Sequence, residues 1–216
     1  MINTVLFDLD GTLLDTTEGI LESVKYTAKQ LAYRELPYEK MIKFVGPPIQ
    51  NSFIKYYGCD KETAQRAANI FRDYYKSKAL LKAVPYEGIY ELCEKLKQYD
   101  LKLAVATYKR EDYALKLLKY FGFDKYCASM HGADNLNVLT KADIINFCMK
   151  ETGGTIGNTV LVGDTVHDAK GAEKAGIRFI AVTYGFGFKT ESDVVYPNIG
   201  IANSVAEIYE IFASAK

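Results

Sequence analysis

Three short apolar stretches of this sequence each end in a side chain that carries oxygen. The stretch TVLF is followed by Asp8 and Asp10, KLAVA by Thr107, and VLVG by Asp164. In open sheets of parallel strands, ligands bind beyond the carboxyl ends of the strands. A single acidic strand end means little, because Asp is common in turns. Three such ends together predict one site that contains these side chains.

The spacing of Asp8 and Asp10 raises an electrostatic question. Side chains two residues apart on a strand point the same way, so the two carboxylates should repel each other. A bound cation or a shared proton would offset that repulsion. Together with Asp164, the pair forms an oxygen-rich cluster that suits Mg²⁺. An EF-hand calcium loop is excluded, because Gly11 comes too early in DLDGTLLD and a buried strand precedes it.

Further candidates lie close to these strand ends in the sequence. Asp168 follows Asp164 by four residues, and it either supports the metal ligands or is an ordinary acid in the first turn of a helix. Lys141 begins the helical stretch KADIINF, where it either holds a phosphate beside a metal or is a solvated surface lysine. We predict that His167 and His131 are surface or structural residues.

Strand-like and helix-like patterns alternate through most of the chain. The stretches NTVLF, LKLAVAT, TVLVG and RFIAVTY are short and apolar on both faces, as in parallel strands covered by helices. Between them, apolar residues recur at helical spacing, as in Ile89, Leu92, Cys93 and Leu96. This alternation predicts an α/β fold with a doubly wound parallel sheet.

The region from Thr16 to Lys82 breaks this alternation, because it has helical periodicity without a convincing strand. We expect one helix near its start, with Asp15 as N-cap and Glu18 completing a capping box, and another over Asp60 to Leu81. The chain is therefore predicted to have an α/β core formed by residues 1–15 and 83–216, with an inserted all-helical domain at residues 16–82.

The composition excludes several classes of protein. Lys and Arg together number 27, as do Asp and Glu, so no net charge favours nucleic acid or an anionic membrane as partner. No apolar stretch approaches the roughly 20 residues that a membrane-spanning helix needs, and the N-terminus lacks the pattern of a signal peptide. Four scattered cysteines show neither metal-binding nor disulfide spacing. We expect a cytoplasmic protein, a monomer or a homodimer.

Four segments of the chain resemble the motifs of the haloacid dehalogenase superfamily. They are DLDGTLLD (residues 8–15), ATYK (106–109), TKADII (140–145) and VGDTVHDAKGA (162–172). The stretches KFVGPPIQNSF (43–53) and VTYGFG (182–187) are similar to the phosphoglycolate-phosphatase-like branch, which carries a helical cap. The resemblance covers essentially the whole chain. It implies a Rossmann-like catalytic core with a cap inserted after the first motif.

The resemblance also implies a role for each candidate residue. Asp8 would be the nucleophile that forms an aspartyl-phosphate, and Asp10 would protonate the leaving oxygen and then activate water. Asp8, Asp10 through its backbone carbonyl, and Asp164 would hold Mg²⁺, with Asp168 in support. Thr107 and Lys141 would bind the phosphoryl oxygens. The implied activity is that of a phosphatase acting on a small phosphorylated metabolite such as phosphoglycolate, a nucleotide or a sugar phosphate.

Some points stay open on the sequence. The second motif of this branch more often has Asn or Ser where this chain has Tyr108, and Lys109 competes with Lys141 for the phosphate. In the cap, Lys43 and Gly46 are predicted to bind substrate, because a glycine permits close backbone approach; the alternative is an ordinary turn between helices. A phosphomutase and a phospho-accepting signalling domain are the rival functions.

Overall fold

The computed structural model describes residues 1–134 and 138–214. The chain forms two compact units, of which the first comprises Met1–Asp15 and Pro85–Lys216 and the second Thr16–Val84. Among the described residues, no helix is long and apolar enough to cross a membrane. The roles of the two units as catalytic core and cap stay a prediction.

The first unit is built on a six-stranded parallel sheet with the order β5-β4-β1-β6-β7-β8. Its strands are β1 (Thr4–Phe7), β4 (Lys102–Arg110), β5 (Cys127–Ala133), β6 (Thr159–Gly163), β7 (Arg178–Val182) and β8 (Ile201–Ala202). Phe7 at the end of β1 lies opposite Val105 of β4 and Val162 of β6. Residues that follow β1 therefore emerge between the ends of two neighbouring strands. The predicted doubly wound α/β sheet is confirmed.

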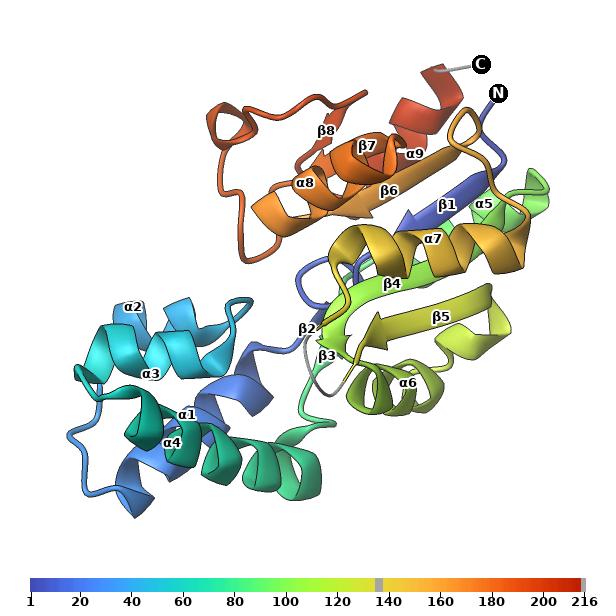
Figure 1. Cartoon of the computed structure of the whole chain (residues 1–216). Coiled ribbons are helices and arrows are strands. Elements are labelled where there is room, and N and C mark those ends of the chain that lie inside the picture. Colours follow the sequence, from blue (N-terminus) through green and yellow to red (C-terminus); the bar gives the residue numbers. More distant parts are fainter. Residues whose placement is uncertain (135–137, 215–216) are drawn as a thin grey trace. The chain divides into compact units, whose positions relative to one another are not determined.

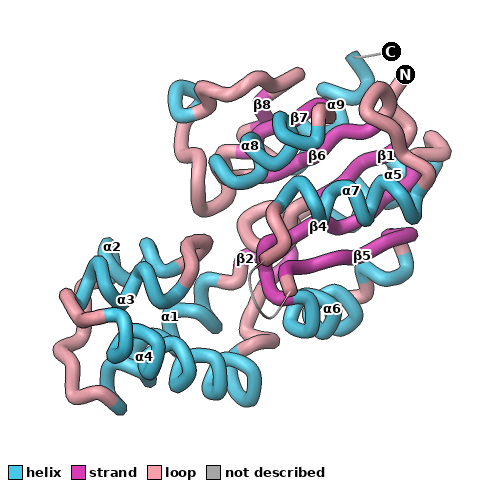
Figure 2. Tube along the Cα trace, viewed as in Figure 1, coloured by secondary structure: helices cyan, strands magenta, loops and turns pink. Residues whose placement is uncertain are grey.

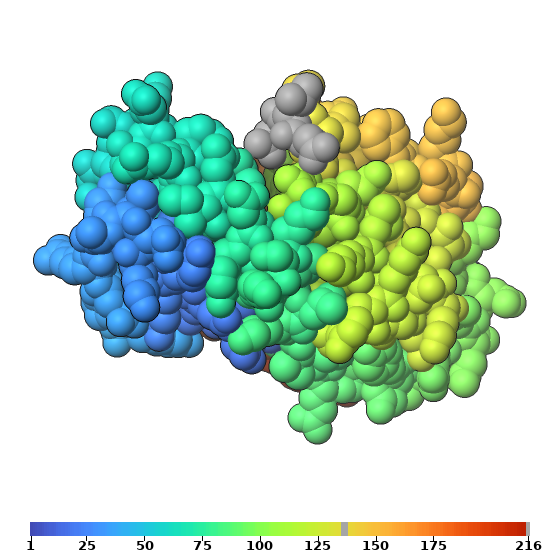
Figure 3. Space-filling view, turned by 90° about the horizontal axis from the view of Figure 1, so that it is seen from below, coloured from blue at the N-terminus to red at the C-terminus, as the bar shows by residue number. Residues whose placement is uncertain are grey.

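Helices cover both faces of this sheet (Figure 1). They are α5 (Ile89–Gln98), α6 (Glu111–Tyr120), α7 (Lys141–Thr152), α8 (Val166–Ala175) and α9 (Val205–Ser214), with short 3₁₀ turns at Phe123–Lys125 and Glu191–Asp193. In Figure 1, α7 and α8 lie side by side in front of the sheet, while α5 and α9 pack together behind it. Helix α6 packs against β4 and β5 and contributes to the surface shown in Figure 3.

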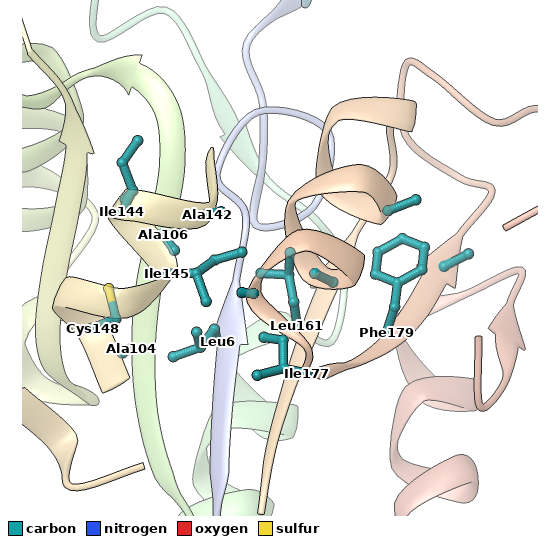
Figure 4. Close-up of a cluster of buried hydrophobic side chains, with 14 of the residues drawn as sticks. Leu6, Ala104, Ala106, Ala142, Ile144, Ile145, Cys148, Leu161, Ile177 and Phe179 are labelled. Carbon is teal, nitrogen blue, oxygen red and sulfur yellow. The ribbon is translucent and has the colours of Figure 1, made fainter. Parts of the chain in front are cut away.

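A continuous apolar layer joins α7 and α8 to the sheet (Figure 4). Leu6 and Leu161 contribute from β1 and β6, Ile144 and Ile145 from α7, and Phe179 from β7. All five side chains are buried. Such close-packed layers resist movement, so the first turns of α7 and α8 are held in fixed positions against the strand ends.

Strand β4 is longer than the sequence indicated. The apolar stretch ends at Ala106, yet the strand continues through Thr107 to Arg110, which pairs with Ala133 of β5 after a register shift. Apolar patterning could not reveal this extension, because the added residues are polar or aromatic and lie at the edge of the core. The extension keeps the second motif in strand geometry.

The second unit contains helices and loops throughout residues 16–83 (Figure 2). Its helices are α1 (Thr17–Gln30), α2 (Tyr38–Met41), α3 (Ile49–Tyr57) and α4 (Lys61–Tyr74), with a 3₁₀ turn at Ile42–Phe44 and a π-helical turn at Tyr75–Ala79. Aromatic side chains fill its centre: the rings of Phe44 and Phe53 meet edge to face at 5.3 Å, and Phe53 stacks on Tyr57 at 5.6 Å.

The predicted capping box at Asp15 and Glu18 is wrong. Asp15 belongs to β2 (Leu14–Asp15), which pairs with β3 (Val84–Pro85), and the N-cap of α1 is Thr16, without a side-chain cap bond. Strand pairing places Asp15 one residue before the N-cap of α1. The expected helix over residues 60–81 is α4 followed by the π-helical turn, and Asp60 is its N-cap.

Candidate active site

Asp8 lies directly after β1 and is paired with a lysine from a distant part of the chain. The Lys141 ammonium donates a hydrogen bond to Asp8 Oδ1 at 2.6 Å, and both side chains are almost completely buried. Lys141 is the first residue of α7, and its helix begins with a capping box between Thr140 and Asp143. Of the two possibilities for Lys141, the solvated surface lysine is therefore wrong.

Asp168 connects this pair to α8. One of its oxygens lies 2.5 Å from the Lys141 ammonium, while the other accepts hydrogen bonds from the backbone N–H and hydroxyl of Thr165. These contacts complete a capping box at the start of α8. Asp168 is thus an acid in the first turn of its helix, and it also contacts the lysine that is hydrogen-bonded to Asp8. Its support of metal ligands stays a prediction.

Asp164 lies at the end of β6 and is held by a loop that sequence reasoning did not assign to the site. Its Oδ2 accepts backbone hydrogen bonds from Phe186 at 2.6 Å and Gly187 at 3.1 Å. Gly185 packs so closely that an added Cβ would lie 2.5 Å from Asp164 Oδ2 and 2.3 Å from the carbonyl oxygen of Gly11. The pair of glycines in VTYGFG was the available indication, since glycines permit such close approach.

Asp10 turns to a different lysine from the one that contacts Asp8. The Lys109 ammonium lies 2.9 Å and 3.1 Å from the two Asp10 oxygens, and the side chains of Lys109 and Asp10 are 8% and 17% exposed. Each member of the Asp8 and Asp10 pair therefore has its own ammonium group. The predicted repulsion is offset in part by two lysines. The sequence by itself indicates only a bound cation or a shared proton for this role.

Thr107 and Tyr108 complete the end of β4. Thr107 is 1% exposed, and its hydroxyl oxygen accepts a hydrogen bond from the Lys109 backbone N–H at 3.2 Å. The Tyr108 residue is 43% exposed, and its ring meets the His167 ring edge to face, with centroids 5.6 Å apart. The structure thus brings together the residues predicted in the first unit: Asp8, Asp10, Thr107, Lys109, Lys141, Asp164 and Asp168.

Burial makes two carboxylates of this cluster, those of Asp8 and Asp164, hard to ionise. It raises the pKa of Asp8 to about 7, against the opposing charge of Lys141, and Asp168 and Asp10 raise it further. Burial also raises the pKa of Asp164 well above its usual range, with added repulsion from Asp168 and Asp8. Burial opposes charge on Lys141, but Asp168 and Asp8 together raise its pKa above the ordinary value. The cluster thus favours added positive charge.

The residues present fit a divalent cation. Carboxylate oxygens of Asp8, Asp164 and Asp168 lie within 4.8 Å of one another, and all three residues are buried. Three carboxylates and the Lys141 ammonium leave two negative charges in excess when all are ionised. A hard divalent cation such as Mg²⁺ binds oxygen ligands of this kind and would balance that charge.

The remaining predicted site residues lie in the second unit or outside the cluster. Lys43 is exposed in the 3₁₀ turn, and Gly46 has φ +100°, with nothing within 4 Å of an added Cβ. Their contact with substrate stays a prediction. His131 lies beside two glutamates, with Nδ1 3.3 Å from Glu111 and Nε2 3.1 Å from Glu151, and its structural role stays a prediction. His167 is exposed at the start of α8.

Comparison with known proteins places this geometry in a family. Residues 5–182 match the family described as haloacid dehalogenase-like hydrolase. The chain is 34% identical to a 5'-nucleotidase of Pseudomonas aeruginosa, over 87% of this chain and 85% of that protein. It is 33% identical to the pyrophosphatase PpaX of Halalkalibacterium halodurans, over 85% of this chain and 84% of that protein.

A solved structure agrees with these sequence relatives. The crystal structure of a predicted phosphatase from Clostridium acetobutylicum is 37% identical, with a TM-score of 0.89 over 99% of each chain. The similarity thus extends over both units and all four motifs. The chain therefore belongs to the haloacid dehalogenase-like hydrolase family, as its motifs predicted, and within that family it is a phosphatase.

Proposed function

We propose that this chain is a Mg²⁺-dependent phosphatase that hydrolyses a small phosphorylated metabolite through an aspartyl-phosphate on Asp8. The observation that carries the proposal is the arrangement of two aspartates, two residues apart, each held by its own lysine at the carboxyl edge of the sheet. Such an arrangement offers a fixed nucleophile and a separate group for proton transfer. Covalent catalysis of this kind splits one difficult step into two easier ones.

In the first step, a carboxylate oxygen of Asp8 attacks the phosphorus atom. The new Asp8 O–P bond forms as the bond between phosphorus and the leaving oxygen breaks, and Asp10 gives that oxygen a proton. Asp8 is nearly buried, so little bulk water competes for the phosphoryl group. Lys141 keeps the nucleophile oriented through its 2.6 Å contact.

In the second step, water replaces Asp8 on phosphorus. Asp10, now without its proton, accepts one from the attacking water, and the acyl phosphate bond of Asp8 breaks to release inorganic phosphate. One acid–base group therefore serves both steps. Its position at the rim, more exposed than Asp8, gives it access to the leaving group and to the incoming water.

Lys109 and Thr107 act on the phosphoryl group in this proposal. The Lys109 ammonium contacts both Asp10 oxygens in the structure. When a phosphoryl group enters, the ammonium can transfer hydrogen bonds from Asp10 to a phosphoryl oxygen. That exchange allows one Asp10 oxygen to hold the proton. The Thr107 hydroxyl offers a further donor at the same strand end.

Asp8, Asp164 and the backbone carbonyl of Asp10 would hold Mg²⁺, while Asp168 supports the site through Lys141. When bound, the cation supplies positive charge to the phosphoryl oxygens. The Phe186 and Gly187 N–H groups fix the orientation of Asp164 as a ligand.

Phosphate release from a panel of compounds tests the proposal. Purified protein should release inorganic phosphate from at least one nucleoside monophosphate, sugar phosphate, phosphoglycolate or pyrophosphate, with Mg²⁺ and not with EDTA. Acetyl phosphate serves as a generic substrate. Absence of release from every compound would contradict the proposal.

The same assays separate the rival functions. A phosphomutase would convert β-glucose 1-phosphate to glucose 6-phosphate, in the presence of a bisphosphate primer, far faster than it releases phosphate. A phospho-accepting signalling domain would accumulate a long-lived phosphoenzyme without turnover. We expect neither result, because Asp10 lies near Asp8 and can activate the water that hydrolyses the phosphoenzyme.

We also expect substitution of Lys43 or Gly46 to change the order of preference among natural substrates more than it changes acetyl phosphate hydrolysis.

A further inference from the structure

Tyr108 has no part in the phosphoryl chemistry proposed above, although both of its neighbours do. Thr107 and Lys109 alternate with it along β4, and the Lys109 ammonium reaches Asp10. Tyr108 lies in the segment between Ala106 and Arg110, where the pairing of β4 with β5 is irregular. The Tyr108 residue is 43% exposed, beside a buried cluster of charges.

The ring is held in place by a contact between two separate elements. Tyr108 comes from the end of β4, and His167 is the second residue of α8, which follows β6. Their rings meet edge to face at 5.6 Å and 88°, a favourable arrangement for aromatic groups. In the sheet, β1 lies between β4 and β6. The pair therefore spans the strand end from which Asp8 emerges.

We propose that Tyr108, braced by His167, forms a stacking surface for a planar leaving group, so that the enzyme prefers nucleoside monophosphates to phosphates of non-aromatic alcohols. This inference rests on the proposed function and adds its substrate class. An edge-to-face contact with His167 covers at most one face of the Tyr108 ring, so at least one face is left for another partner, and the contact restricts rotation of the ring. A ring that is already ordered loses less entropy when a base stacks on it.

The chemistry of the residue supports a planar ligand over a polar one. Asn or Ser at this position would offer short hydrogen-bonding groups to a leaving group, whereas Tyr108 offers an apolar face of much greater area. Stacking of a base on an aromatic side chain tolerates different bases, because every base has a π-face. We therefore expect weak discrimination among bases and clear discrimination between a nucleotide and the same sugar phosphate without its base.

The test compares AMP with ribose 5-phosphate, which share the scissile phosphate and sugar and differ in the base. Wild-type kcat/KM should favour AMP by about fivefold or more, the contribution expected of one stacking contact. Tyr108→Phe keeps the ring and should keep that ratio. Tyr108→Ala should lower the ratio at least fivefold, and His167→Ala should lower it less, because the ring remains but loses its brace.

Tyr120→Ala is the matched control, because Tyr120 also makes an edge-to-face ring contact at the surface of the same unit, with 63% of its residue area exposed. It should leave the ratio unchanged. An unchanged ratio in Tyr108→Ala, or a wild type that does not prefer AMP, would overturn the inference.

Binding separates failure of this inference from failure of the proposed function. In the Asp8→Asn background, calorimetry should detect tighter binding of AMP than of ribose 5-phosphate, and Tyr108→Ala should abolish the difference. If the wild type released no phosphate from any compound, the proposed function would fail, while this binding comparison would still decide the role of Tyr108. Equal binding of both ligands to Asp8→Asn would count against the stacking surface.

Discussion

Two aspartate–lysine pairs at one edge of the sheet differ chiefly in depth. Lys141 and Asp8 have side chains that are 3% and 9% exposed, whereas those of Lys109 and Asp10 are 8% and 17% exposed. In the deep pair, Lys141–Asp8, the lysine also contacts Asp168, and Asp164 lies close by, so carboxylates outnumber ammonium groups there. The rim pair, Lys109–Asp10, has one ammonium group for one carboxylate. We therefore expect the Lys141–Asp8 pair to keep its charges in fixed positions, and the Lys109–Asp10 pair to exchange hydrogen-bond partners and a proton.

Depth also decides what each lysine contributes to the fold. A buried ion pair becomes costly when one partner is removed, because the other charge is left without compensation. A pair closer to water is screened and loses less. The two pairs therefore offer matched substitutions whose effects should differ in kind.

The largest expected effect is on turnover, and it distinguishes the chemical roles of Asp8 and Asp10. Asp8→Asn should lower turnover by about 10⁴-fold or more and form no phosphoenzyme, because the nucleophile is lost. Asp10→Asn should lower turnover by about 10²- to 10⁴-fold and slow both formation and hydrolysis of the phosphoenzyme. Rapid-quench measurement of phosphoenzyme with a labelled substrate checks both. Turnover of Asp8→Asn close to the wild-type rate would refute the mechanism.

The next effect compares the two lysines by stability. Lys141→Met should lower the free energy of unfolding by about 3–5 kcal/mol, because Asp8 and Asp168 stay buried without their ammonium group. Lys109→Met should lower it by about 1 kcal/mol, since Asp10 is closer to solvent. Denaturant unfolding of metal-free protein measures both. Equal losses would show that depth does not distinguish the pairs.

A smaller effect concerns pH. The pKa of Asp8 is raised to about 7 by burial, so the folded state keeps a proton that the unfolded state releases near pH 4. Stability of metal-free protein should therefore fall as pH rises from about 4 to about 7, by an amount on the order of 1–4 kcal/mol from this group. The difference in unfolding free energy between wild type and Asp8→Asn isolates the contribution.

Added Mg²⁺ should stabilise the wild type more at pH 7.5 than at pH 5, because the cation binds ionised carboxylates. Thermal unfolding with and without the cation at both pH values provides the control. A stabilisation that is the same at both pH values would contradict the assignment of Asp8 as a ligand.

The smallest expected effect tests the loop that holds Asp164. Gly185→Ala would place a Cβ 2.5 Å from Asp164 Oδ2, so the loop must shift and its two backbone hydrogen bonds must lengthen. The Mg²⁺ concentration for half-maximal activity should rise about tenfold, a typical result of disturbing groups that orient a metal ligand. Gly157→Ala is the control, because nothing lies within 4 Å of a Cβ there. Similar shifts of the half-maximal Mg²⁺ concentration in both variants would contradict the proposal that this loop orients Asp164.

Sequence patterns predicted β1, β4, β6 and β7 and some of the covering helices for a clear physical reason, but they did not indicate β5 or β8. Buried parallel strands must be apolar on both faces, and covering helices must be apolar on one, so β1, β6 and α5 are evident from residue spacing alone. Failures occurred where pairing partners were distant. The polar end of β4 depends on Ala133 of β5, and Asp15 is held in β2 by β3.

In the candidate site, too, some features follow from local residue spacing and others depend on distant partners. The sequence by itself determined that Asp8, Asp10 and Asp164 follow central strands and that Thr107 follows the apolar part of β4. Because parallel strands align their carboxyl ends, it follows that these four residues meet at one edge. The motifs themselves sufficed to indicate the family. These are consequences of local order along the chain, which residue spacing expresses directly.

Only the tertiary structure decided how these groups are paired. Lys141 is separated from Asp8 by 133 residues and Lys109 from Asp10 by 99, and nothing local specifies which lysine meets which acid. The same holds for the N–H groups of Phe186 and Gly187 on Asp164. These contacts depend on the depth at which each strand end lies and on the helix packed over it. Ionisation follows burial and neighbouring charge, and both arise only when the whole sheet is assembled.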